Sequence, residues 1–173
     1  MSGEAKPLHG WRLLGESTDY AEFGNGRLSS RSIATWTLSL SNGGWKPVTF
    51  SSGCQPRVLR HGRPAITWTL ARGQHLNAST QSAKVDLGAG ECAGGRSQDE
   101  RLERPQFRVE NGALLMSLWI RPVDPDRNYT CVGTIEPPVT IRLPKRLGGR
   151  ELLDGGVFPP MSSAEQIRRD ERI

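Results

Sequence analysis

Residues 106–120 read Gln106-Phe107-Arg108-Val109-Glu110-Asn111-Gly112-Ala113-Leu114-Leu115-Met116-Ser117-Leu118-Trp119-Ile120, and this stretch decides the fold class. Asn-Gly supplies the two positive φ angles of a type I′ turn, which is the strongest short-range signal of a β-hairpin. The residues after the turn are almost continuously apolar, as expected for a strand covered on both faces. The stretch therefore predicts a hairpin whose second strand is central in a sheet.

Alternating apolar and polar residues mark two further strands. Residues 33–40 place Trp36, Leu38 and Leu40 on one face, and residues 64–70 repeat the string Thr-Trp-Thr-Leu around Trp68. Because the flanking sequences do not match, we interpret the strings as two similar strands and not as a repeat. Shorter candidates lie at residues 45–50, 85–87 and 139–143, and Pro47 favours an edge position for the first of them.

The composition favours the same class. A length of 173 residues suits one domain, and 35% hydrophobic residues with 20 Gly and 12 Pro are typical of a turn-rich β protein. We predict an all-β fold over residues 1–160, an antiparallel two-sheet β-sandwich that is Ig-like or related. Residues 161–173 are predicted to form a charged C-terminal tail, short and helical or frayed. No run approaches the ~20 apolar residues that span a bilayer, so no transmembrane segment is expected.

The chain contains no catalytic motif that we can identify. His9, His61 and His75 are its histidines, and none lies in a zinc-binding HExxH motif. No serine lies in a GxSxG turn, the glycines form no phosphate-binding loop, and no cysteines have the spacing of a zinc or redox site. We therefore predict no catalytic residue, no metal and no cofactor. A hydrolase site assembled from distant loops is the alternative.

The net charge of +5 is unevenly distributed along the chain. Residues 23–85 contain eight Lys and Arg and no Asp or Glu. The densest part holds Arg57, Arg60 and Arg63, between turn-forming residues. Two interpretations are open. These arginines form a binding site for an anionic partner, or folding mixes them with acidic residues from residues 86–173 on a solvated surface.

Cys54, Cys92 and Cys131 are the cysteines of the chain. An odd number permits one disulfide and one free thiol, and Cys92 and Cys131 lie in turn-like surroundings. Three reduced, buried thiols are the alternative.

The second half of the chain resembles a β-rich domain of uncharacterised actinobacterial secreted proteins and lipoproteins. The resemblance extends over about residues 61–160 and is carried by the strand around Trp68, Cys92-Ala93-Gly94-Gly95-Arg96-Ser97, residues 113–122, Cys131, residues 137–143 and Leu147-Gly148-Gly149-Arg150-Glu151-Leu152-Leu153-Asp154-Gly155-Gly156. It implies a Cys92–Cys131 disulfide and an extracytoplasmic location, and it implies no reaction. The N-terminus lacks the apolar region of a signal peptide, which makes a cytoplasmic location the alternative. Asp154 is interpreted as a turn former.

These observations favour a non-catalytic extracytoplasmic binding or structural module that recognises an anionic cell-envelope component through Arg57, Arg60 and Arg63. The expected partners are an anionic polymer, a lipid surface or another protein. The alternatives are a subunit of a larger assembly, a hydrolase, and a nucleic-acid-binding protein that uses residues 23–85. Nucleic acid ranks lower because the basic segment lacks the interleaved aromatic residues of common RNA-binding modules.

Overall fold

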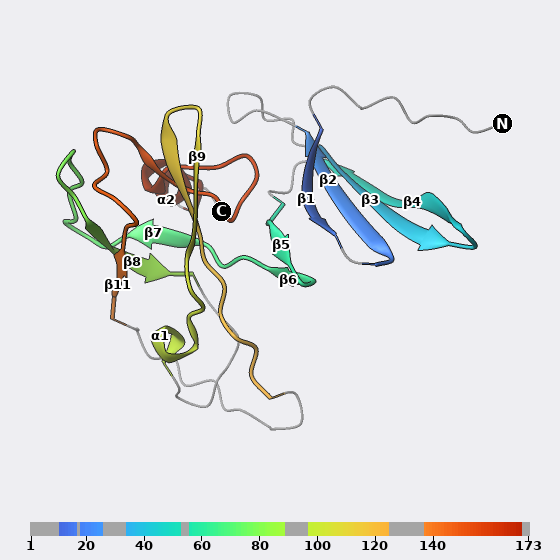
Figure 1. Cartoon of the computed structure of the whole chain (residues 1–173), viewed down its shortest axis with the longest axis horizontal. Coiled ribbons are helices and arrows are strands. Elements are labelled where there is room, and N and C mark those ends of the chain that lie inside the picture. Colours follow the sequence, from blue (N-terminus) through green and yellow to red (C-terminus); the bar gives the residue numbers. More distant parts are fainter. Residues whose placement is uncertain are drawn as a thin grey trace.

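The computed structural model describes residues 11–16, 18–25, 34–52, 56–88, 97–124 and 137–170. These residues form twelve strands and two short helices, and the predicted all-β, sandwich-like fold is confirmed (Figure 1). Neither of the described helices is long and apolar enough to cross a membrane.

The predicted hairpin consists of β9 (Gln106–Glu110) and β10 (Ala113–Ser117). Asn111 and Gly112 have φ angles of 49° and 79°, as a type I′ turn requires. On its other side β10 pairs in parallel with β12 (Leu152–Asp154). The hairpin's second strand is therefore the central strand of a three-stranded sheet, as its apolar sequence predicts.

A second three-stranded sheet packs against the first and completes the sandwich. Its order is β11 (Val139–Arg142), β8 (Ser82–Leu87) and β7 (Trp68–Leu70). Trp68 and Met116 lie between the sheets with exposed fractions of 1% and 0%, and the Trp68 Nε1–H donates to the Met116 carbonyl at 3.1 Å. The other members of this core are Ile66, Ala83, Val85, Leu114, Leu118, Ile141, Leu143, Leu147 and Leu152.

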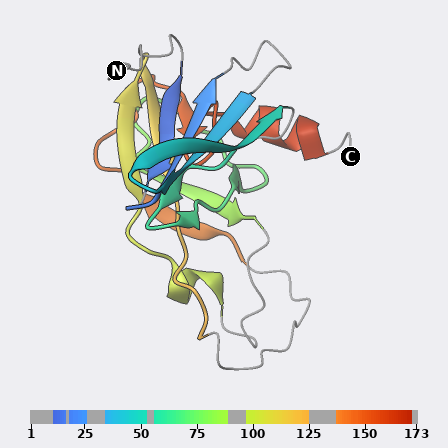
Figure 2. The same cartoon turned by 90° about the vertical axis from the view of Figure 1, so that its right-hand side faces the viewer.

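A four-stranded antiparallel sheet lies beside the sandwich. It consists of β1 (Arg12–Glu16), β2 (Tyr20–Asn25), β3 (Ala34–Ser41) and β4 (Gly44–Ser52), in that order, and Figure 2 shows it in front of the other elements. Small residues face the sandwich: Thr35 is buried, and a Cβ on its partner Gly24 would lie 2.7 Å from the Phe158 ring. The opposite face of β3, with Trp36 and Leu38, therefore points away from the core.

Short elements connect the sheets. β5 (Leu59–Arg60) and β6 (Arg63–Pro64) form a two-stranded ribbon, whose turn places His61 and Gly62 at φ angles of 51° and 72°. The helix α1 (Gln98–Arg101) precedes β9. His61 fits the turn between β5 and β6 because histidine adopts the left-handed conformation more readily than most residues.

The helix α2 (Ser163–Asp170) lies within the predicted C-terminal tail and packs against β7. Ser162 and Glu165 form a capping box, because the Ser162 N–H donates to Glu165 Oε2 at 2.9 Å and the Glu165 N–H donates to Ser162 Oγ at 3.3 Å. The Leu70 N–H donates to Ser163 Oγ at 2.9 Å. With Gln166 only 6% exposed, the first turns of α2 are part of the folded domain.

Candidate functional site

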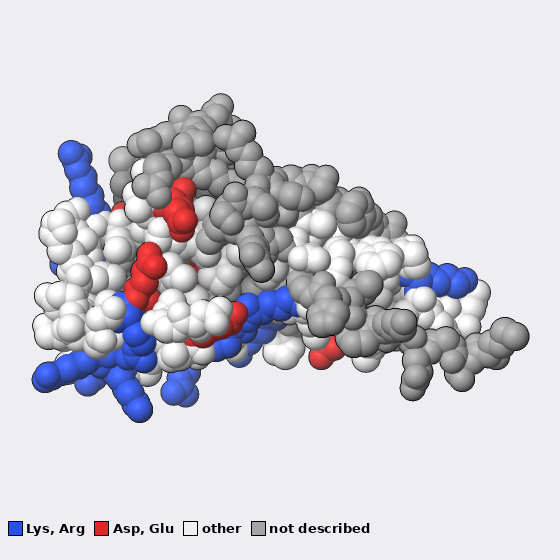
Figure 3. All heavy atoms as spheres, turned by 90° about the horizontal axis from the view of Figure 1, so that it is seen from above, with Lys and Arg blue, Asp and Glu red and all other residues white. Residues whose placement is uncertain are grey.

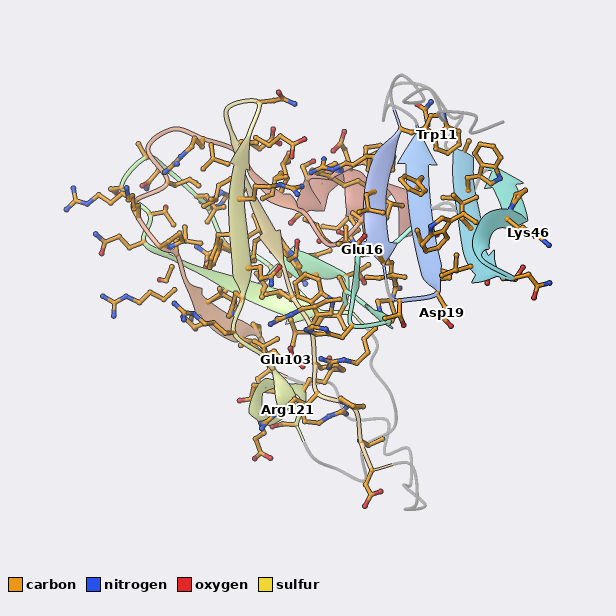
Figure 4. The ribbon with its side chains drawn as sticks, turned by 45° about the vertical axis from the view of Figure 1, so that its right-hand side comes forward. Trp11, Glu16, Asp19, Lys46, Glu103 and Arg121 are labelled. Carbon is orange, nitrogen blue, oxygen red and sulfur yellow. The ribbon has the colours of Figure 1, made fainter. Side chains whose placement is uncertain are left out.

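The predicted anion site lies on the β5–β6 ribbon and beside it, where two of its arginines face a carboxylate. Arg63 Nη1 is 2.6 Å from Glu103 Oε1, and Arg60 Nη1 is 3.4 Å from Glu103 Oε2. The hydrogen bond from Arg63 and the nearby positive charges lower the pKa of Glu103, so this carboxylate is ionised at neutral pH. Figure 4 shows Glu103 between α1 and the base of β9.

Trp119, which follows the hairpin strand β10, contacts both of these arginines. Its Nε1–H donates to the Arg63 carbonyl at 3.3 Å, and its ring centroid lies 5.6 Å from Arg60 Cζ, within cation–π distance. Folding thus brings an acid from outside residues 23–85 onto this cluster. Among the described residues, Arg57 forms no ion pair. The role of Arg57, Arg60 and Arg63 in binding stays a prediction.

A second group of exposed cations lies on the β11-β8-β7 sheet and in the turns that follow β7 and β11, and we call it the basic face. Lys84 pairs with Thr140, and Arg142 pairs with Ser82, so both cations point to the same side of the sheet. Two backbone hydrogen bonds, from Leu143 N–H to the Gln81 carbonyl and from Leu147 N–H to the Thr80 carbonyl, hold the following turn against the strand. We define the basic face as Lys84 and Arg142 on the strands together with Arg72 in the turn after β7 and Lys145 and Arg146 in the turn after β11, all exposed.

None of these five side chains forms an ion pair within the described part of the chain. Figure 3 shows Lys and Arg gathered at one end of the molecule. Sequence analysis missed this site because three of its members lie outside the acid-free segment. The signal was present in the alternation Thr140-x-Arg142 followed by Lys145-Arg146, which places cations on the polar side of a strand and in the next turn.

Among the described residues, the most deeply buried carboxylate belongs to Asp154, at the end of β12, with an exposed fraction of 1%. Its Oδ1 accepts from the Gly156 N–H at 2.8 Å, which is the predicted turn-forming contact, and its Oδ2 accepts a weak bond from the Trp68 N–H at 3.4 Å. Burial raises the pKa of Asp154 to about 7, although these bonds, the charge of Arg57 and the Gln166 side chain act against the rise. Asp154 joins β12, β7 and α2 and has no open path to solvent.

Two cavities lie on opposite sides of the first sandwich sheet. One, of about 390 Å³, is lined by His75, Glu151, Ser162 and Ser163 among others. Both serine hydroxyls already bond within the α2 cap and to β7, and no hydrogen bond joins His75 to a carboxylate or a hydroxyl among the described residues. The described residues therefore contain no assembled nucleophile and base that favour the hydrolase alternative. The other cavity, of about 380 Å³, lies between β1 and the β9–β10 hairpin.

Cys54, Cys92 and Cys131 lie outside the described residues. The Cys92–Cys131 disulfide that the family resemblance implies therefore stays a prediction. No protein-family model, no curated protein and no solved structure matches this chain.

Proposed function

We propose that the protein is a non-catalytic binding module that recognises an anionic polymer of the cell envelope through its basic face. The observation that supports the proposal is the grouping of five exposed cations without carboxylate partners in the described structure. Arginine can hold phosphate, sulfate or carboxylate groups by two parallel hydrogen bonds. The extracytoplasmic location in this proposal comes from the family resemblance.

The arrangement of the basic face suits a chain of repeating anions better than one small anion. Its cations are spread over two strands and the turns beside them, and the hydroxyls of Ser82 and Thr140 lie between Lys84 and Arg142 as further donors. Cations spread in this way can contact several successive groups of a polymer, and each contact adds a modest, salt-sensitive contribution to the affinity.

The same surface argues against single-stranded nucleic acid as the first choice. Proteins that bind single strands stack bases on aromatic side chains, whereas the outward residues of the described strands β7, β8 and β11 are Thr69, Ser82, Lys84, Asp86, Thr140 and Arg142. A polymer whose repeating unit carries an acidic group but no base fits these residues.

Replacing Lys84, Arg142 and Arg146 together with Ser is expected to abolish most of the affinity for polyphosphate and dextran sulfate. The plot of log affinity against log salt concentration should lose about three units of slope, one for each removed contact. Isothermal titration over a series of salt concentrations measures both quantities, with neutral dextran as the control polymer.

The matched control is the variant with Arg57, Arg60 and Arg63 replaced by Ala. Because Glu103 already neutralises part of that cluster, this variant should retain most of the affinity. If instead the control loses binding and the basic-face variant keeps it, the arginines singled out from the sequence are the site and our assignment of the basic face is wrong.

One observation favours a second candidate function, a subunit of a larger assembly. The outer face of the four-stranded sheet exposes Leu13, Leu40 and Trp45 by 44%, 40% and 49%. Exposed apolar groups that share a face are typical of an interaction surface. Replacing Leu40 and Trp45 with Ser should reduce self-association in light-scattering measurements without lowering the melting temperature, and a monomeric parent protein would count against self-assembly through this face.

A further inference from the structure

The cavity between β1 and the β9–β10 hairpin has walls of both apolar and polar residues, and these come from two different sheets. Its volume is about 380 Å³, at the lower end of the range of small-molecule sites. Leu14 contributes from β1, Leu115 and Trp119 from β10 and the residues that follow it, and Val157 and Phe158 from the segment after β12. Aromatic and aliphatic side chains thus surround a space large enough for a small organic molecule.

This cavity is confined to one face of β10. Leu114 and Met116 point into the close-packed core of the sandwich, while Leu115 and Ser117 point the other way and line the cavity. Gly155 forms part of the wall, where a Cβ would lie 2.9 Å from Leu115 Cβ and 3.0 Å from Ser117 Oγ. The space opens to solvent, because Gln106 and Arg108 in its wall are exposed. A cleft of this size beside a well-packed strand has the form of a small-molecule binding site.

Two arginines line the cavity and share one carboxylate. Arg12 donates from Nη1 and Nη2 to the two oxygens of Glu110, each at 2.8 Å, and Arg108 Nε lies 3.1 Å from Glu110 Oε2. The hydrogen bond from Arg12, with the charges of both arginines, lowers the pKa of Glu110. Burial and the charge of Arg12 lower the pKa of Arg108. Two cations and one anion leave a positive charge at the cavity.

Arg108 has donors to spare. It meets Glu110 through Nε, and its two terminal Nη groups have no partner within the described residues. Glu110 itself is not among the residues that line the cavity. An acidic group in the cavity would therefore meet the guanidinium of Arg108 without having to displace the existing pairs.

We propose that this cavity binds a small amphipathic anion, an apolar molecule that carries one carboxylate, sulfonate or similar acidic group. The apolar body lies against Leu115, Trp119 and Phe158, and the acidic group accepts hydrogen bonds from Arg108. Such a site is independent of the basic face, which lies on the other sheet of the sandwich.

Fluorescent probes of matched shape test the proposal on the full-length chain. Anilinonaphthalene sulfonate is an apolar aromatic molecule with one acidic group, and N-phenyl-1-naphthylamine has the same rings without the charge. Both should bind, the anionic probe more tightly. Arg108→Met should weaken the anionic probe about tenfold or more, the equivalent of one charge-assisted hydrogen bond, and should leave the neutral probe unchanged. An equal effect on both probes would overturn the assigned role of Arg108.

Glu110→Gln gives a prediction of opposite sign. Removing the carboxylate leaves both arginines for the ligand, so the anionic probe should bind several-fold more tightly while the neutral probe does not change. If the ion pairs of Glu110 with Arg12 and Arg108 served only to hold the cavity in shape, Glu110→Gln would weaken the binding of the anionic probe, as Arg108→Met does. That outcome would contradict the proposal.

Filling the cavity with a large side chain should abolish the binding of both probes. Ser117→Trp places a large side chain in it, and Gln106→Trp does the same from an exposed position on β9 if the first variant does not fold. Arg104→Met is the control and should change neither affinity, because Arg104 is an exposed arginine outside both the cavity and the basic face. If the parent protein binds neither probe, or if both filled variants bind them as the parent does, the cavity is not a ligand site.

Discussion

Replacing Asp154 with Asn is expected to stabilise the protein above neutral pH and to remove much of the fall in its stability between acid and neutral pH. The cause is burial, which raises the pKa of this carboxyl from 3.8 to about 7 in the folded chain. Between these values the folded state holds a proton that the unfolded state has released. The free energy of unfolding therefore falls as the pH rises through this window and levels off above it.

The magnitude follows from the size of the pKa difference. About three pH units correspond to at most about 4 kcal/mol of lost stability once Asp154 is ionised. Asn carries no charge at any pH and keeps one acceptor for the Gly156 N–H. Gln166 Oε1 is buried and has no hydrogen-bond partner among the described residues, so it is available to accept from the new amide group.

Chemical denaturation at several pH values measures this effect. Asp154→Ala is the informative companion, because it also removes the charge but leaves the Gly156 N–H without its acceptor. It should flatten the pH dependence as Asp154→Asn does, and it should be less stable than Asp154→Asn at every pH by about 1–3 kcal/mol. If the free energy of unfolding of Asp154→Asn falls with pH as steeply as that of the parent protein, Asp154 does not titrate between acid and neutral pH.

Trp68→Ala is expected to cost about 3–5 kcal/mol, whereas Trp36→Ala should cost about 1–2 kcal/mol. Trp68 is 1% exposed in the sandwich core and its indole donates to the Met116 carbonyl. Trp36 is half-buried on the outer face of β3, where its ring contacts Trp11 with centroids 6.0 Å apart. The larger loss is a substantial part of the 5–15 kcal/mol that stabilises a typical domain.

Urea unfolding followed by circular dichroism compares the two variants directly. Trp68→Phe keeps most of the apolar volume but removes the indole N–H, and it should fall between the parent and Trp68→Ala. Equal losses for Trp36→Ala and Trp68→Ala would mean that the four-stranded sheet and the sandwich contribute equally to the cooperative core, contrary to the burial of the two side chains.

Sequence determined the local parts of this protein. Asn111-Gly112 dictates its turn because those residues tolerate positive φ angles, and alternation marks the strands because side chains point to opposite faces in turn. The apolar run after residue 113 predicts a central strand, and Pro47 predicts an edge strand, since it cannot donate a ladder hydrogen bond. Both strands have these positions in the sheets.

The candidate sites depended on contacts between distant segments, which local patterns do not encode. Glu103 lies 40 residues from Arg63 in sequence and 2.6 Å from it in space. The basic face combines cations from the acid-free segment, residues 23–85, with cations from residues 142–146. The cavity takes its walls from β1, from the hairpin and from the segment after β12. Charge counted along the chain located the cations and left open whether acids from residues 86–173 would neutralise them. The fold shows that Glu103 does so for Arg60 and Arg63.

The two Thr-Trp-Thr-Leu strings separate these contributions most clearly. Local sequence is sufficient to make both of them strands, because β-branched and aromatic residues in alternation fit an extended backbone. Which tryptophan is buried was decided only by tertiary structure. Trp68 lies in β7 and faces the β12-β10-β9 sheet across the sandwich. The side of the four-stranded sheet opposite Trp36 packs against Phe158 at Gly24 of β2. Burial is a property of what lies across the sheet, and a strand's own residues do not specify its neighbour.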